Sequence, residues 1–129
     1  MEMNMNNPHA TASDAFQTFA TEAQEHFKAL MGMAQGFEKA SALDKKTESL
    51  AYLAVLAALR MESGVPFHTG LAKKAGASRD EVKSAILVGM PAAGLAVTQC
   101  LPAALAAYDA SNRHASSVPR SPHPFSIAA

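Results

Sequence analysis

The sequence predicts an all-α fold, and three observations point to it. Apolar residues recur at helical spacing along most of the chain, and no segment alternates with a period of two residues. Helix-capping signals precede these segments, namely Ser13, Asp44 and an S-x-x-E box formed by Ser78 and Glu81. The apolar residues are mainly Ala, Leu, Val and Met, since aromatics make up only 6% and Trp is absent. We expect five or six helices that approach one another closely through small side chains.

The N-terminal half of the chain predicts two helices. The first begins at the N-cap serine, carries an apolar stripe and ends near Gly32 or Gly36. The second begins at the N-cap aspartate and ends near Gly64. From Leu50 to Leu59 this helix is apolar all round, which predicts burial from several sides. In so small a domain such a helix usually needs cover from another subunit, so the sequence predicts self-association.

Proline and glycine place the remaining helices. Pro66 suits the first turn of a third helix, and Gly76 suits the position after its end. The S-x-x-E box starts a fourth helix. Pro91 either separates that helix from a fifth or kinks the two into one. Pro102 should bend the final helix, which is expected to run to about Tyr108.

The domain organisation follows from composition. A single helical domain is expected at residues 13–112. A Met- and Asn-rich segment at residues 1–12 precedes it and is predicted to be disordered. A Pro- and Ser-rich tail at residues 113–129 is predicted to be flexible.

Charge and cysteine content exclude several function classes. Eleven basic and eleven acidic residues give a formal net charge of zero, which argues against a nucleic-acid partner or an anionic membrane surface. The longest apolar run is too short for a membrane span.

The single cysteine, Cys100, allows no intrachain disulfide and is expected to be a buried, inert residue. The start of the chain lacks a signal-peptide pattern, so a cytoplasmic location is expected. The histidines show no metal-ligand spacing, so no metal is expected.

Three segments carry a family resemblance. They read LDKKTESLAYLAVLAAL from Leu43, FHTGLAKKAGASRDEVKSAIL from Phe67 and GMPAAGLAVTQCLPAALAAYD from Gly89. In this order and at these spacings, residues 43–109 resemble the carboxymuconolactone decarboxylase family. The resemblance implies an alkylhydroperoxidase D-like (AhpD-like) helical fold. It also implies assembly with copies of itself, as a homotrimer or a homohexamer.

The chain departs from the redox branch of that family. Members similar to alkylhydroperoxidase D carry a Cys-x-x-Cys pair followed by a histidine, with a glutamate one helix upstream. Here the cysteine positions hold Met61 and Gly64, the acidic position holds Ser49, and only His68 remains. Peroxide reduction by that route needs a nucleophilic and a resolving thiol. With Cys100 as its only thiol, the chain is therefore more similar to the lactone decarboxylase branch.

The resemblance and the chemistry together select candidate site residues. His68 is expected at a helix start, where the helix dipole lowers the pKa of an imidazole and free N–H groups steady developing negative charge. It is the candidate proton-transferring residue, with Glu62 as its candidate partner. Ser49, Ser63 and Pro91 are candidate substrate-binding residues. The non-functional alternatives are that His68 packs beside Phe67 and bonds a backbone carbonyl, and that Glu62 is a solvated loop carboxylate.

Two function hypotheses from different classes remain open. The first is a cofactor-independent acid–base enzyme of the lyase type, a decarboxylase-like carboxy-lyase that acts on a small carboxylated lactone or oxo acid. The second is a non-catalytic oligomer that binds a ligand or has a structural role. A pocket in which His68 and a second polar group converge favours the enzyme, whereas a packed His68 with Met61 filling the space favours the second hypothesis. A third hypothesis, a thiol peroxidase partner with peroxiredoxin activity, is disfavoured by the single cysteine.

Overall fold

The computed structural model describes the backbone of residues 13–116 and the side chains of residues 13–110. The segment 1–12, and residues 117–129 of the predicted tail, lie outside this range. The all-α prediction is confirmed, because the described residues form helices and no strand. The elements are α1 (Asp14–Glu22), α2 (Gln24–Ala40), α3 (Lys45–Ala58), the 3₁₀ turn η1 (Glu62–Gly64), α4 (Val65–Lys74), α5 (Arg79–Leu87), α6 (Met90–Ala93), the 3₁₀ turn η2 (Leu95–Cys100) and α7 (Leu101–Ser116).

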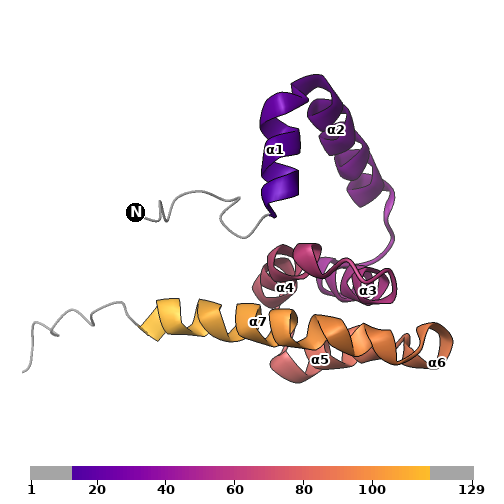
Figure 1. The fold of residues 1–129 in the computed structure, drawn as a ribbon, viewed down its shortest axis with the longest axis vertical. Coiled ribbons are helices and arrows are strands. Elements are labelled where there is room, and N and C mark those ends of the chain that lie inside the picture. Colours follow the sequence, from indigo (N-terminus) through magenta and orange to yellow (C-terminus); the bar gives the residue numbers. More distant parts are fainter. Residues whose placement is uncertain (1–12, 117–129) are drawn as a thin grey trace, which may run out of the picture.

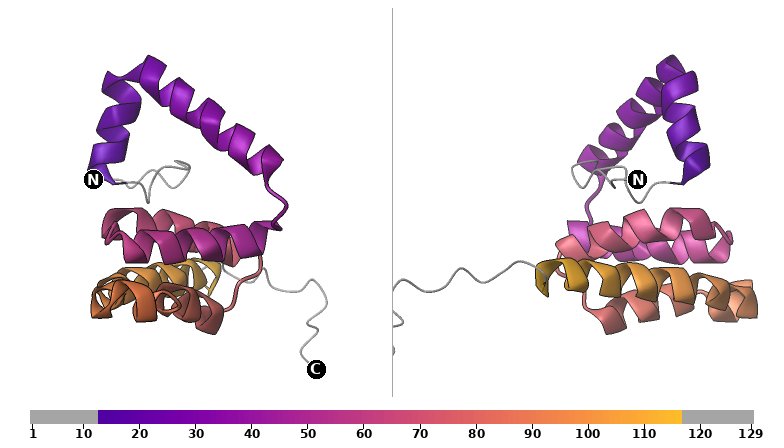
Figure 2. Two further views of the ribbon diagram at one scale, coloured as in Figure 1. Left: turned by 90° about the vertical axis from the view of Figure 1, so that its right-hand side faces the viewer. Right: turned by 60° about the vertical axis from the view of Figure 1, so that its left-hand side comes forward.

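The described chain has two parts. Residues 13–40, which we call the arm, form a helical hairpin of α1 packed on α2 (Figure 1). Residues 45–116, which we call the body, hold the other helices. The body is layered, with α3 and α4 lying between the arm and the layer that contains α5 and α7 (Figure 2). Contacts between the arm and the body are sparse.

The arm corrects the prediction of a single first helix. Ser13 caps α1 as expected, its Oγ accepting from the N–H of Phe16 at 3.2 Å. The helix then breaks at Ala23, whose φ of −128° and ψ of 57° are not helical, and α2 continues through both glycines at which an end was predicted. The break lets the ring of Phe27 pack edge-on against those of Phe16 and Phe19, with centroids 5.7 and 5.9 Å apart. This cluster of three phenylalanine rings holds α1 and α2 together as a hairpin.

The start of α3 was predicted and its end was not. Asp44 caps the helix, its Oδ1 accepting from the N–H of Thr47 at 2.7 Å. The helix ends at Ala58 rather than near Gly64, because Arg60 adopts the left-handed conformation with φ 57°. The N–H of Met61 then donates to a carbonyl five residues earlier at 2.9 Å, which is the Schellman arrangement. A glycine usually occupies this left-handed position, so an arginine there does not signal the end of a helix.

The ends of α4 and the start of α5 match the sequence. Pro66 lies in the first turn of α4. Gly76 has φ 99° directly after the C-cap, and the N–H of Ala77 donates to the carbonyl of Ala72 at 2.9 Å. At α5 the Ser78 hydroxyl and the Glu81 carboxylate each accept from the other residue's backbone N–H, so the predicted capping box is present.

The two later prolines both begin helices. Pro91 lies in the first turn of α6. Of the two predicted alternatives, it therefore separates α5 from the following helix and does not kink the two into one. Pro102 is the second residue of α7, where its missing N–H has no helical partner to lose. The expected bend at Pro102 is therefore wrong. The final helix also extends past Tyr108 to Ser116.

The body holds the core. Helices α3, α4, α5 and α7 and the turn η2 all contribute, and no residue of the arm is buried. The core side chains are small, as the composition predicted, and α3 packs against both α4 and α5. The buried apolar residues are Leu53, Leu56, Ala57, Val65, Ala72, Ala77, Val82, Ile86, Val97, Cys100 and Ala104.

Polar contacts fix α7 across the turn between α4 and α5. The Tyr108 hydroxyl donates to the carbonyl of Ala77 at 2.8 Å, and the Lys73 ammonium donates to the carbonyl of Tyr108 at 2.9 Å. The same ammonium lies 4.4 Å from the centre of the Tyr108 ring. Arg79 and Asp109 form a two-bond ion pair at 3.0 and 3.2 Å. Within the described residues no helix is long and apolar enough to cross a membrane.

Candidate functional site

His68 lies in the first turns of α4, in the place that the sequence predicted. Its imidazole stacks on the ring of Tyr52 from α3, with centroids 4.2 Å apart and planes inclined by 29°. The ring of Phe67 meets the imidazole edge-on at 5.2 Å. Half-burial between these rings lowers the pKa of His68 below its ordinary value of 6.5. The direction matches the prediction, but the cause is burial rather than the helix dipole.

The imidazole nitrogens are not engaged by the protein. Among the described residues, no hydrogen bond or ion pair involves the His68 side chain, and Thr69 Oγ1 is the one polar side-chain atom that is fully buried without a partner. The nitrogens of His68 therefore reach the surface. The alternative of an imidazole that bonds a backbone carbonyl is not what the structure shows. His68 is held by its contacts with two rings, and neither of its nitrogens is fully buried or has a partner among the described residues.

Tyr52 is the site residue that sequence reasoning missed. It carries the only polar atom among the side chains of the run from Leu50 to Leu59, and that hydroxyl was the one available signal. Which residue of α3 meets His68 depends on how α3 and α4 align, and the sequence alone does not give that alignment. Ser49 precedes Tyr52 by three residues, so it lies on the same face of α3, about 4.5 Å away along the axis.

Glu62 forms no hydrogen bond or ion pair with His68 in the part of the chain that the structure describes. It lies exposed in η1. Burial raises the pKa of the Cys100 thiol, and the negative charge of Glu62 raises it further. Cys100 is fully buried, as expected. Ser63, also in η1, is exposed.

The helix start beside His68 offers fewer free N–H groups than predicted. The turn η1 runs directly into α4, so the N–H of Gly64 donates to the carbonyl of Met61 at 3.1 Å and that of Val65 donates to Glu62. Pro66 has no N–H. Stabilisation of negative charge by this helix start is therefore weaker than a free N-terminus would give.

The two hypotheses about the site each find support. Met61 is 51% exposed, so it does not fill the space beside His68 as a structural remnant would require. However, two surface depressions of the protein, one between α3 and α5 and one where α2 meets α3, are both lined by residues other than His68. Pro91 lies exposed on α6, which packs on η2. The structure brings together His68 and Tyr52, and among the described residues it records no hydrogen bond, ion pair or ring contact of Ser49, Glu62, Ser63 or Pro91 with them.

No group of three or more His, Cys, Asp or Glu side chains suited to a metal ion occurs within the part of the chain that the structure describes. The site consists of the His68 imidazole and the Tyr52 phenol, and helical spacing adds the Ser49 hydroxyl on the same face of α3. This set suits proton transfer and hydrogen bonding to a small polar ligand.

Comparison with known proteins gives one match. The sequence model of the carboxymuconolactone decarboxylase family matches residues 24–110, which include α2, the body helices through most of α7, and the Tyr52–His68 pair. No curated protein and no solved structure shows a significant similarity to the chain.

Proposed function

The chain belongs to the carboxymuconolactone decarboxylase family, and we propose that it is a cofactor-independent acid–base catalyst of the lyase type, acting on a small carboxylated lactone or oxo acid. The observation that supports this is the state of His68. Its imidazole stacks on Tyr52 and meets Phe67 edge-on, its nitrogens have no partner among the described residues, and burial lowers its pKa. A lowered pKa keeps the imidazole neutral near pH 7, so that one nitrogen can accept a proton while the other carries one. A fixed position favours such a proton transfer.

The proposed step is a decarboxylation. The C–C bond to the substrate carboxylate breaks, CO2 leaves, and the electron pair stays on the carbon as an enolate. A proton that passes through His68 from water converts that carbon to C–H. In this proposal Tyr52 orients the imidazole, and the hydroxyl of Ser49 on the same face of α3 binds a substrate oxygen. Glu62 has at most an indirect role, because no hydrogen bond or ion pair joins it to His68 among the described residues.

The test is CO2 release from a panel of lactone acids and oxo acids by the purified full chain. His68→Asn is expected to reduce kcat at least about a hundredfold, the lower end of what loss of a positioned acid–base group costs. His26→Asn is the matched control, because His26 lies exposed on the arm. Helix content by circular dichroism should be unchanged in both variants. Normal turnover by His68→Asn would refute the acid–base role.

The second candidate is a non-catalytic oligomer that binds a ligand. The stacking of His68 on Tyr52 and the absence of His68 from the two depressions favour it. If no compound of the panel releases CO2, while a small carboxylate perturbs the NMR signals of His68, this second function is supported instead.

A further inference from the structure

The second half of α2 exposes large apolar side chains that the described residues do not cover, although the carboxylate of Glu38 in the same half pairs with the Lys45 ammonium at 3.1 Å. Residues 32–40 of this helix are all exposed, with Met33 at 54% and Phe37 at 71%. The first half of α2 packs on α1, but the hairpin buries no residue completely. Isolated helices of this length are marginal in water, because helix stability comes mainly from packing an apolar face. The arm therefore lacks the cover that a stable helix of this composition needs.

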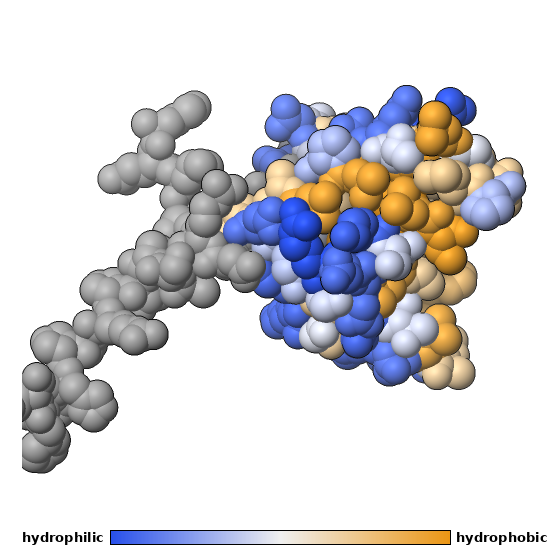
Figure 3. All heavy atoms as spheres, turned by 90° about the horizontal axis from the view of Figure 1, so that it is seen from below, coloured by the Kyte–Doolittle hydropathy of each residue, from blue (hydrophilic) through white to orange (hydrophobic). Residues whose placement is uncertain are grey.

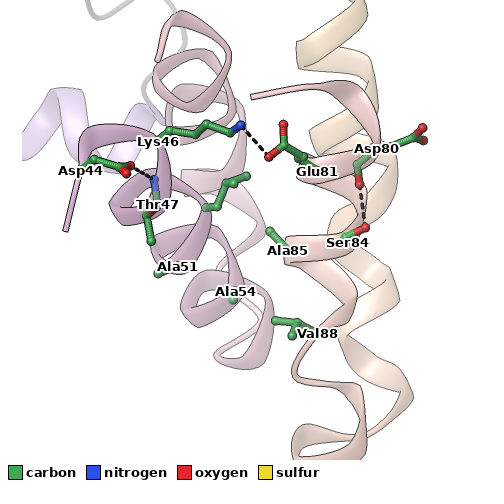
Figure 4. Close-up of a pocket in the computed structure, with 11 residues that line it drawn as sticks. Asp44, Lys46, Thr47, Ala51, Ala54, Asp80, Glu81, Ser84, Ala85 and Val88 are labelled. Carbon is green, nitrogen blue, oxygen red and sulfur yellow. Dashed lines mark hydrogen bonds and ion pairs between the residues drawn. The ribbon is translucent and has the colours of Figure 1, made fainter. Parts of the chain in front are cut away.

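A groove between α3 and α5 offers such cover. Its volume is about 690 Å³, and its floor consists of the apolar side chains of Leu50, Ala51, Ala54, Ala85 and Val88 (Figure 4). Val88 at the end of α5 is 67% exposed. The alanines matter because small side chains let a visiting helix approach closely.

Polar residues line the end of the groove near the starts of α3 and α5. The ammonium of Lys46 and the carboxylate of Glu81 form an ion pair across it at 2.8 Å (Figure 4). That pair and the backbone N–H of Ser78 lower the pKa of Glu81, so its carboxylate stays ionised. The groove thus has an apolar floor and a charged end, which is the form that receives an amphipathic helix.

We propose that α2 of a second copy of this chain lies in the α3–α5 groove, with Met33 and Phe37 as its anchors. The lengths agree: residues 32–40 span about 13 Å of helix, and the groove follows α3 from Thr47 to Ala54 over about 12 Å. The chain's own arm does not reach this groove. It rises from the start of α3 on the side of the α3–α4 layer that faces away from α5 (Figures 1 and 2).

The exposed apolar area fits an interface between copies. The outward face of α3 continues the groove with Tyr52, Val55 and Leu59, and further apolar surface appears on the face seen from below in Figure 3. Six large apolar side chains of the arm, of α3 and of α5 are between 49% and 71% exposed. At roughly 200 Å² for a large side chain they present on the order of 700 Å² per copy. A standard interface buries about 800 Å² per partner.

Cysteine cross-linking tests this contact directly. Full-length Phe37→Cys and full-length Val88→Cys proteins, one of them isotopically labelled, are mixed under mild oxidation; Cys100 is fully buried and stays out of the reaction. We expect a disulfide-linked heterodimer of the two variants. Leu95→Cys is the matched control, because Leu95 is 73% exposed but lies outside the groove, and its yield with Phe37→Cys should be at least about tenfold lower. Equal yields would refute the proposal.

A chain that carries both Phe37→Cys and Val88→Cys tests whether the groove is filled by the arm of the same chain or by that of a second copy. A disulfide within a single 13.5 kDa chain would show that its own arm fills the groove, and the proposal would be wrong. Light scattering gives an independent measure. The unaltered protein should exceed 13.5 kDa at micromolar concentration, Val88→Glu should weaken assembly at least about tenfold, and Leu95→Glu should not. A monomeric unaltered protein would equally overturn the proposal.

Discussion

Helices α2 of the arm and α3 of the body differ little in length, with 17 and 14 residues, yet they have opposite environments. Helix α3 contributes three buried residues and packs against α4 and α5. Helix α2 contributes none and packs mainly on α1. The difference shows that helix formation and burial are specified separately along this chain. Capping and periodicity produce helices in both parts, whereas a shared core exists only in the body.

The largest expected effect compares one apolar residue from each part. Leu53→Ala removes a fully buried side chain of α3 and should lower the free energy of unfolding by about 2–5 kcal/mol. Phe37→Ala removes an exposed side chain of α2 and should change the free energy of unfolding of the monomer by less than about 0.5 kcal/mol. Urea denaturation at a concentration at which the protein is monomeric measures both values. Equal losses would mean that the arm and the body unfold as one cooperative unit.

The second prediction is a stabilising substitution in the body. The hydroxyl of Thr69 is fully buried on α4 and has no hydrogen-bond partner among the residues that the structure describes. Thr69→Val keeps the shape and removes that hydroxyl, so it should raise the free energy of unfolding by about 1 kcal/mol. The exposed Thr21 of the arm, whose hydroxyl donates to backbone carbonyls of α1 at 3.1 and 3.2 Å, provides the control Thr21→Val. Destabilisation by Thr69→Val would show that the hydroxyl has an unseen partner, such as an ordered water.

Local signals allowed much of the fold to be predicted from the sequence. Ser13, Asp44, Gly76 and the Ser78–Glu81 box act within one turn of helix, so their roles can be read without knowing the tertiary structure. The break at Ala23 depends on three phenylalanine rings that meet only after the chain reverses. The end of α3 depends on a left-handed arginine, which no common sequence pattern marks.

The same distinction applies to the candidate site. The place of His68 near the start of a helix followed from Pro66, one position before Phe67. Its stacking on Tyr52 did not follow, because that contact needs the alignment of two separate helices. The pairing of Glu62 with His68 was inferred from closeness in sequence, but no hydrogen bond or ion pair joins the two within the described residues. Residues adjacent in sequence across a turn need not face each other.

The third prediction uses pH to sharpen the comparison. Burial keeps the pKa of His68 below 6.5 in the folded body, so the unfolded chain binds a proton first as the pH falls. The contribution of His68 to the free energy of unfolding is fully present above about pH 6.5. It is lost as the pH falls from there through the lower pKa of the folded state. His68→Phe should flatten this part of the stability profile, measured by urea denaturation between pH 5 and pH 8. His26→Asn in the arm should leave it in place, and a profile that His68→Phe leaves unchanged would contradict burial as the cause.

The smallest expected effect compares two glycines that differ only in the part of the molecule that holds them. Gly36 in α2 and Gly70 in α4 are both exposed and helical, and an added Cβ meets no atom within 4 Å at either position. Replacement by Ala should favour each helix by up to about 1 kcal/mol. In Gly70→Ala this gain should appear as a higher urea midpoint, because α4 unfolds with the core. In Gly36→Ala of a monomeric sample it should appear only as slower amide hydrogen exchange along α2, with the midpoint unchanged. If Gly36→Ala instead raises the midpoint in proportion to protein concentration, the arm gains its cooperativity from a second copy. That result would connect the helix propensity of α2 to its docking in the α3–α5 groove.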